Sequence, residues 1–480
     1  MGLKLFCKKN TFIMTDFFNI KFNKDIFLIS IGNVFRILLV IAYSRLMTYF
    51  LDYDQLSKYY IVFSIYTFFS FIIIGSIGTY VNRKTIEWVQ DKTLKDGLSM
   101  LLKNILAPII IIAFFSVFLY SYIVYQSVNY SLLICLLVCS LILFKTSSES
   151  IYPIFNLLNL NFKYIYILIL FNLLNLILSS LFVYFFDFSF QYWMLGLISS
   201  NFLIAIISWN SLGQEFKLNN KSNLNYKEIY SFSSSILVGH VLIWFLTDGY
   251  RFIAENKFNS DILGILLLGL IVASQIFAVI ENVLSQLLYP IYLKNISNKT
   301  FEKRSEAFNV YLNKIIPIIL FTAIFISLSP FEVLIILVDS SKINNELILV
   351  FQIGLWIEFL RILVNTLKHI TISEYKTSKI IIPYSFGAIS FFAGIIFLDL
   401  TVTEFPLLLL SSYIVISISS LFLFNRIIRI KFNFLYYLKL ILYLSPMLIC
   451  LVYFKNITTL LISGIYLSLI LYQLINNDTN

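Results

Sequence analysis

The sequence predicts an all-α protein that crosses a membrane many times, and three observations lead to this class. Of the 480 residues, 59% are hydrophobic and 12% are charged, whereas soluble proteins carry about 25% charged residues. Aromatic residues reach 18%, with 48 Phe and 31 Tyr, and mean hydropathy is +0.88. A water-soluble chain of this length does not bury so much apolar surface. The same values exclude a disordered chain, and four Cys are too few for a disulfide scaffold.

Fourteen apolar runs are long enough to cross a hydrocarbon core of about 30 Å, which takes roughly 20 residues. The eighth run is longer than a straight crossing requires, so we expect a bend near Pro290. Pro330 interrupts the apolar stretch after the ninth run. In chain order the runs are 26–48, 59–81, 104–124, 131–154, 164–186, 191–210, 229–250, 262–289, 311–329, 347–368, 379–399, 405–424, 435–453 and 456–475.

The Lys and Arg residues set the expected orientation. The N-terminal segment and the alternate loops that share its side hold 27 of them, and the opposite loops hold 5. Cytoplasmic loops retain basic residues, so we expect both termini in the cytoplasm. Residues 1–25 carry five Lys without a compact apolar stretch, which does not fit a cleavable signal peptide.

A weak internal repeat predicts two lobes. Arg45 is followed by Lys58 after 13 residues and by Arg83 after 38, and Arg251 is followed by Gly264 after 13 and by Pro290 after 39. Two bundles of like orientation imply a pseudo-two-fold axis along the membrane normal and a central cavity. The expected parts are a cytoplasmic segment, a six-helix lobe, a linker, a second six-helix lobe and two further helices, at 1–25, 26–210, 211–228, 229–424 and 425–480.

Several function classes are excluded or disfavoured. The net charge of +10 fits basic cytoplasmic loops better than a nucleic-acid surface. No hydrophilic loop is long enough for a nucleotide-binding domain, and no GxxxxGK[ST] motif occurs. Two His and four Cys leave little for a metal or nucleophile site, so we predict no catalytic residue, metal or cofactor.

Charged residues at membrane depth mark candidate sites, because each costs about 2.5–3.5 kcal/mol to insert. Arg36 lies ten residues into the first run, about 15 Å deep at 1.5 Å per residue. Asn33 and Arg45 lie on the same side of that helix, which would make it line the cavity. Two interpretations of Arg36 stay open: it binds an anionic substrate, or it pairs with a carboxylate and holds helices together.

Further deep charges lie in the second half. Glu358 and Arg361 are three residues apart and can pair on one helix face, as can Asp248 and Arg251. Glu281 has no such partner, so it is either protonated or paired across the cavity with a base such as Arg36. We expect the cavity to hold more Arg than unpaired acids, which suits an anionic head group because Arg clamps phosphate oxygens.

Two neighbouring features have plainer interpretations. Lys145 and Glu149 are spaced to pair on one helix. His240 lies in mid-helix, where a hydrogen-bonded structural role is favoured over a proton relay.

The segment 44–88, SRLMTYFLDYDQLSKYYIVFSIYTFFSFIIIGSIGTYVNRKTIEW, resembles the polysaccharide flippases of the multidrug/oligosaccharidyl-lipid/polysaccharide exporter superfamily. The features concerned are Arg45 at the end of the first helix, the KYY that opens the second, and the exit IGTYVNR with Gly78, Asn82 and Arg83. The DGYR at 248–251 is similar to the corresponding start of the second half.

This resemblance implies alternating access and transport of undecaprenyl-pyrophosphate-linked oligosaccharide units for O-antigen or capsule synthesis. It implies a polysaccharide polymerase and a chain-length regulator as possible partners, and no nucleic acid. The candidate substrate-binding residues are Asn33, Arg36, Arg45, Arg83, Arg251 and Arg361, and the candidate ion-coupling residues are Asp248, Glu281 and Glu358. Two alternatives remain: a membrane enzyme of the O-antigen polymerase type, disfavoured by the short outer loops, and a cation-coupled multidrug exporter, whose cavity would hold more acids than bases.

Overall fold

The computed structural model describes residues 24–91, 93–158, 160–212, 226–296, 300–374 and 376–431, together with 445, 451, 458–459, 462–464 and 466. Helices account for almost all of the described chain, and no strand occurs in it. Within these described ranges, eleven helices are long and apolar enough to cross a membrane. The predicted all-α membrane protein is therefore confirmed.

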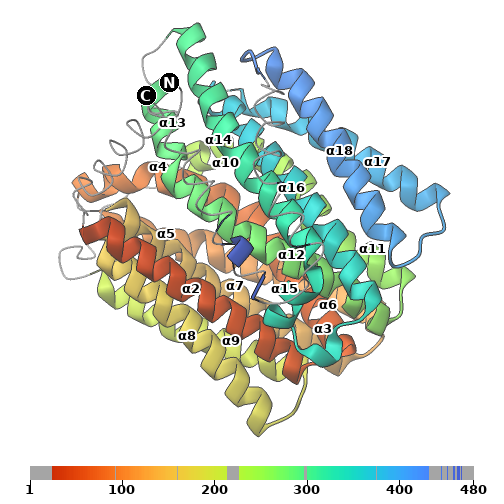
Figure 1. Ribbon diagram of the computed structural model, residues 1–480. Coiled ribbons are helices and arrows are strands. Elements are labelled where there is room, and N and C mark those ends of the chain that lie inside the picture. Colours follow the sequence, from red (N-terminus) through yellow and green to blue (C-terminus); the bar gives the residue numbers. More distant parts are fainter. Residues whose placement is uncertain are drawn as a thin grey trace.

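The first half of the chain contains helices that follow the six predicted runs (Figure 1). We call the described residues 24–212 the first half. Its elements are α2 (Lys24–Phe50), α3 (Tyr53–Thr67), η1 (Phe68–Ile74), α4 (Gly75–Gln90), α5 (Leu94–Leu101), η2 (Leu102–Leu106), α6 (Ala107–Tyr125), α7 (Val128–Leu157), α8 (Asn161–Phe185) and α9 (Phe190–Ser211). The segments η1 and η2 are π-helical.

The second half, residues 226–431, likewise follows six predicted runs. Its elements are α10 (Tyr226–Trp244), π-helical η3 (Phe245–Gly249), α11 (Tyr250–Lys257), α12 (Ser260–Leu287), α13 (Tyr289–Ile296), α14 (Phe301–Leu328), α15 (Pro330–Leu337), η4 (Ser340–Lys342), α16 (Asn345–Ser373), η5 (Thr377–Ile380), α17 (Ile381–Phe397) and α18 (Glu404–Asn425). The predicted helices at 435–453 and 456–475 fall almost entirely outside the described residues.

Local chemistry explains where the helices end. Asp52 accepts a hydrogen bond from the backbone N–H of Gln55 and so caps α3, which therefore begins six residues before the predicted run. The long eighth run ends as a helix at Leu287, just before Pro290, as predicted. The ninth ends at Leu328, and Pro330 then opens α15, because Pro is favoured in the first turn of a helix.

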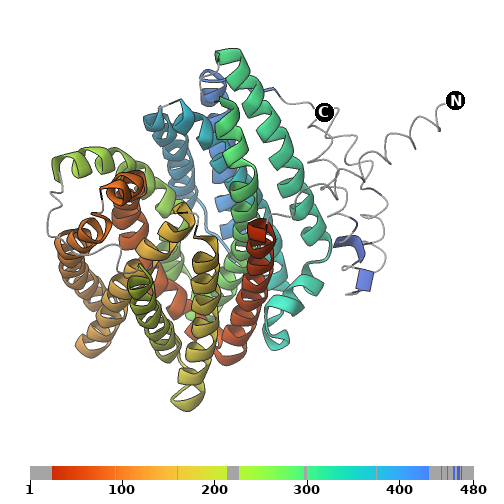
Figure 2. The same cartoon turned by 90° about the vertical axis from the view of Figure 1, so that its left-hand side faces the viewer.

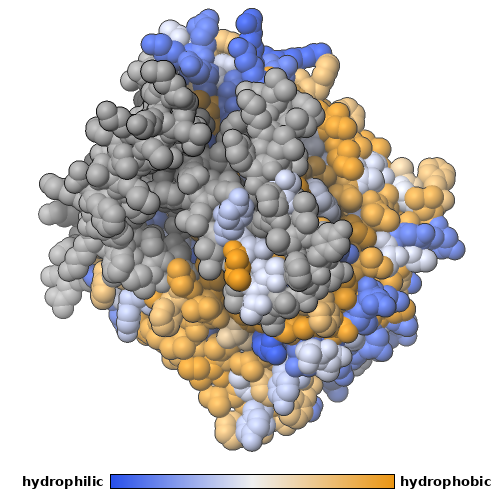
Figure 3. Space-filling view, viewed as in Figure 1, coloured by the Kyte–Doolittle hydropathy of each residue, from blue (hydrophilic) through white to orange (hydrophobic). Residues whose placement is uncertain are grey.

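Each half packs mainly on itself. In the first half α9 packs on α7 and α8, and α2 packs on α8; in the second half α16 packs on α12 and α18, and α17 packs on α18. Most of the long helices run side by side in one bundle (Figure 2). On the face that Figure 3 shows, hydrophobic residues cover broad areas of the described surface, and hydrophilic ones gather at the top and at the lower right of the view. The proposed lobe boundaries at 26–210, 211–228 and 229–424 stay a prediction.

The halves meet most closely at one end of the bundle, which we call the closed end, where α2, α6 and α11 finish. Here the Arg45 guanidinium donates to the Ile335 carbonyl, and the Asp339 N–H donates to Thr48 Oγ1 over 2.9 Å. The Tyr125 hydroxyl donates to Glu255 over 2.8 Å. Helices α3 and α12 also touch backbone to backbone, since a Cβ on Gly264 would lie 2.2 Å from the Tyr53 carbonyl oxygen.

Candidate functional site

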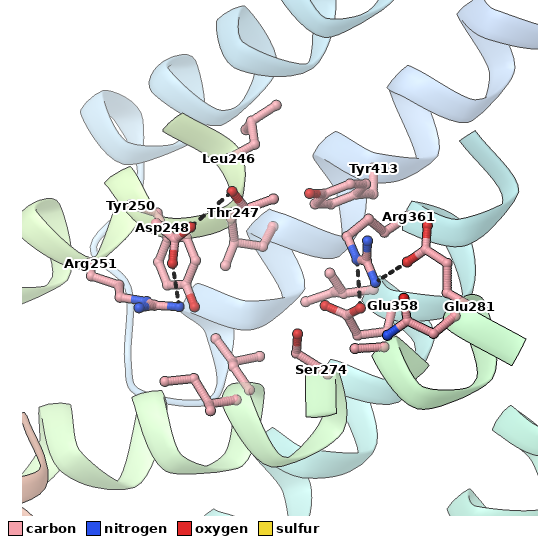
Figure 4. Close-up of a pocket in the computed structure, with 17 residues that line it drawn as sticks. Leu246, Thr247, Asp248, Tyr250, Arg251, Ser274, Glu281, Glu358, Arg361 and Tyr413 are labelled. Carbon is pink, nitrogen blue, oxygen red and sulfur yellow. Dashed lines mark hydrogen bonds and ion pairs between the residues drawn. The ribbon is translucent and has the colours of Figure 1, made fainter. Parts of the chain in front are cut away.

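A cavity of about 300 Å³ lies within the second half, between η3, α11, α12, α16 and α18 (Figure 4). Two groups of charged residues line it. Asp248 and Arg251 lie on one side, and Glu281, Glu358 and Arg361 lie together on the other. The cavity therefore brings together five of the nine residues predicted from sequence.

Arg361 is the centre of the second group. Its Nε lies 2.6 Å from a Glu358 carboxylate oxygen, three residues earlier on α16, so this predicted pair is confirmed. Its Nη2 lies 2.9 Å from Glu281 on α12. Asn365, one turn further along α16, donates to the same Glu281 over 2.8 Å. Glu281 thus pairs with a base, as one interpretation expected, and that base is Arg361 rather than Arg36.

Arg251 links the cavity to the other half of the chain. Its Nη2 lies 2.7 Å from Asp248, as the spacing predicted, and its Nη1 donates to Ser64 of α3 over 2.9 Å. Arg251 is 7% exposed. The π-helical segment η3 ends immediately before Tyr250, so Asp248 belongs to the widened turn and Arg251 to α11. Sequence patterns miss the Ser64 contact because the partner lies 187 residues away.

The charges of this cavity are paired. Three carboxylates and two guanidiniums line it. The sequence predicted more Arg than unpaired acids, and each acid in the lining has an Arg partner: Asp248 pairs with Arg251, and Glu281 and Glu358 pair with Arg361. An ion-paired Arg is not free to clamp a phosphate unless its carboxylate partner is protonated or displaced.

A second polar cluster lies in the first half and involves Arg36. Tyr152 on α7 lies within electrostatic range of both Arg36 and Glu149. On the same helix, Lys145 Nζ lies 3.8 Å from Glu149 and 4.6 Å from the centre of the Phe63 ring. Within the part of the chain that the structure describes, no ion pair to Arg36 occurs. Two bases and one acid make this cluster positive. We call Arg36, Lys145, Glu149 and Tyr152 the basic cluster.

The remaining predicted residues lie elsewhere. Arg45 is exposed and binds a backbone carbonyl at the closed end, so it does not join the basic cluster or the cavity. Asn33 belongs to α2 and Arg83 to α4. His240 Nδ1 lies 3.0 Å from the Ser76 hydroxyl, which fits the structural role favoured for it. No group of three potential metal ligands of the His, Cys, Asp or Glu type occurs among the described residues.

Two polar residues of the cavity region, Asn365 and Ser64, are not among those predicted from the sequence. Asn365 follows Arg361 by four residues and therefore shares its helix face, so spacing alone would have indicated it. Ser64 carries no such signal.

Comparison with known proteins identifies solved structures that have a similar fold. No protein-family model and no curated protein sequence matches the chain. Among solved structures it is similar to "Lipid II flippase MurJ, inward closed conformation", with a TM-score of 0.64 and 13% identity over 95% of this chain and 99% of that one. It is also similar to an outward-facing MATE family multidrug transporter of the MOP superfamily, with a TM-score of 0.52 and 14% identity over 84% and 95% of the two chains. A MATE structure in the straight conformation gives a TM-score of 0.54 with 12% identity over 82% and 95%. The chain therefore has the fold shared by MurJ and the MATE transporters of the MOP superfamily.

Proposed function

We propose that the protein is a flippase that moves undecaprenyl-pyrophosphate-linked oligosaccharide units from the cytoplasmic to the outer leaflet of the bacterial inner membrane. The units would serve surface polysaccharide synthesis, with a polymerase and a chain-length regulator acting afterwards. Transport would proceed by alternating access, without an enzymatic step. The fold supports this class because one of its neighbours is described as a lipid II flippase, whose cargo is also lipid-linked.

The observation that carries the proposal is the basic cluster. Arg36 lies at membrane depth without an ion pair among the described residues and within electrostatic range of the hydroxyl-bearing Tyr152, which shares α7 with Lys145. An unpaired guanidinium is free to bind a pyrophosphate bidentately. Nearby tyrosines and Glu149, whose side chain is 40% exposed, offer polar atoms to sugar hydroxyls. Arg251 and Arg361 would join the substrate only after their carboxylates are released. Arg45 is less favoured because it binds the Ile335 carbonyl at the closed end, whereas Asn33 and Arg83 stay candidates.

The proposal can be tested with the purified protein in liposomes that contain a fluorescent undecaprenyl-pyrophosphate oligosaccharide. An externally added glycosidase reports how much of the lipid has reached the outer leaflet. Transport should exceed that of protein-free vesicles and should fall with Arg36→Ala. Vesicles whose lipid stays inaccessible with the wild-type protein would contradict the proposal.

A cation-coupled multidrug exporter is the second candidate, and the acid excess in the second-half cavity favours it. Such a protein would extrude a lipophilic cationic dye under a proton or sodium gradient and would leave the lipid-linked oligosaccharide in place. Measuring both activities in the same vesicles separates the two functions. Under the first proposal, Glu281, Glu358 and Asp248 instead couple transport to an ion.

A further inference from the structure

A second, much smaller cavity adjoins the first and shares Glu281 with it. Its volume is about 10 Å³, and Ser285, Tyr311, Asn365 and His369 are among its lining residues. A volume of this size holds about one water molecule, and a buried water typically needs two to four polar partners. Glu281, Ser285, Asn365 and His369 supply that many. The small cavity is thus polar enough and large enough for a single water.

His369 is the residue toward which a hydrogen-bonded path from Glu281 through the small cavity would lead. Its Nδ1 is buried, and no protein group in the described ranges bonds to it. Buried polar atoms are nearly always satisfied by protein or by ordered water. The imidazole ring is fixed by aromatic neighbours: its centre lies 4.2 Å from that of Tyr289 and 6.0 Å from that of Tyr311. His369 also lies four residues after Asn365, on the same face of α16.

We infer that a water bound in the small cavity links the Glu281 carboxyl group to His369 Nδ1 and carries protons between the large cavity and the far end of α16. In the outward step the protonated Glu281 gives its proton to the water, and the water gives one of its protons to Nδ1. The other ring nitrogen then releases a proton, which leaves a neutral imidazole and an ionised Glu281. This inference rests on the proposed ion-coupling role of Glu281.

The charged neighbours shape this step. Arg361 is paired with Glu281. Lys368 lies within electrostatic range of Glu281, Arg361 and His369. The tyrosines on neighbouring helices, Tyr289, Tyr292 and Tyr311, are uncharged near neutral pH, and Glu358 is neutralised by Arg361.

The chain contains only two histidines, His240 and His369, which makes a direct test possible. The full-length protein, labelled with ¹⁵N-histidine and placed in lipid nanodiscs, should give two imidazole spin systems, assigned with the His240→Gln variant. Magnetisation from water protons should reach His369 Nδ1 in the wild-type protein. Absence of that transfer would overturn the inference without any mutation of the site.

A variant series then tests the link to Glu281. Glu281→Gln should shift the His369 Nδ1 resonance and leave His240, which faces Ser76, unchanged. Glu255→Gln is the matched control, since that carboxylate binds Tyr120 and Tyr125 at the closed end, and it should move neither resonance. A His369 signal that ignores Glu281→Gln would refute the relay. No transported substrate enters this experiment, so its outcome is separate from that of the flippase test.

Discussion

Arg361 illustrates how a charge is held at membrane depth. It contacts two carboxylates, and the exposed fractions of the three side chains are 17% for Arg361, 27% for Glu281 and 11% for Glu358. Removing one partner from a buried ion pair leaves an uncompensated charge and costs about 3–5 kcal/mol. Removing Arg361 and removing one of its acids therefore affect stability differently. When one acid is removed, the other still neutralises Arg361, whereas removing Arg361 leaves both acids without their ionic partner.

We therefore expect Arg361→Ala to destabilise the protein by about 3–5 kcal/mol, the range for breaking a buried ion pair. Glu281→Gln should cost much less, because Arg361 keeps its 2.6 Å contact with Glu358. Thermal unfolding of the purified variants in detergent measures both. Equal losses from the two substitutions would contradict this account of the cluster.

Arg36 is the opposite case, because under the proposed function this base binds the substrate. A hydrogen bond to a charged group contributes about 1.5–3 kcal/mol, which corresponds to about 10- to 150-fold in affinity. Arg36→Ala should lower transport by a factor in that range, with lipid-linked units accumulating on the inner leaflet and protein abundance unchanged. Arg36→Lys should keep part of the activity, since it retains the charge and loses the planar fork.

The matched control for Arg36 is Arg426→Ala, which removes an Arg that stacks on Phe422 at 4.7 Å and lies far along the chain from the basic cluster. It should transport as the wild type does. If Arg36→Ala instead lowers abundance while the remaining protein transports normally per molecule, then Arg36 is structural.

At the scale of helices, the contact between α3 and α12 sets how closely the two halves approach. Gly264 allows it, because any Cβ there would collide with the Tyr53 carbonyl. Membrane helices commonly pack closely at small residues, which let their backbones approach. They depend on such packing because lipid supplies no hydrophobic driving force for helix association. The closed end is therefore held by backbone contact as well as by the Arg45 and Glu255 hydrogen bonds.

Gly264→Ala should push α3 and α12 apart and open the closed end. A Cys placed at Ser57, which is 2% exposed on α3, should then react faster with a membrane-impermeant thiol reagent. Gly239→Ala provides the control, because nothing lies within 4 Å of the Cβ it would add. Unchanged labelling in the Gly264 variant would show that the helices do not separate there.

Sequence patterns predicted the helices well and the contacts between them poorly. Apolar runs determine membrane helices because a backbone in lipid must satisfy its own hydrogen bonds, and twelve runs became helices in the described residues. Pairs such as Glu358 and Arg361 follow from i,i+3 spacing. The contacts of Arg361 with Glu281 and of Arg251 with Ser64 depend on tertiary packing, which no local spacing encodes. The π-helical segments are missed for the same reason.

For the whole molecule, the asymmetry of 27 against 5 Lys and Arg residues predicts which end faces the cytoplasm. The closed end should face outward. With the four native Cys replaced, a single Cys at Asn129 or Asn259, both exposed, should react with an impermeant thiol reagent in intact cells. A Cys at Lys303, at the start of α14, should react only after lysis. Labelling of position 303 in intact cells would reverse the orientation.

The hydrogen bond between Trp244 and Thr67 has a kinetic consequence. The Trp244 indole N–H donates to Thr67 Oγ1 over 3.1 Å, and these two residues immediately precede η3 and η1. A π-helical turn is a natural point for a helix to bend, and the bond joins such a turn in one half to such a turn in the other. If both helices flex, they flex together. Under the proposed alternating access, exchange between the two access states should then be cooperative, a single concerted barrier crossing in which a half-converted molecule is too short-lived to release its cargo to the wrong side.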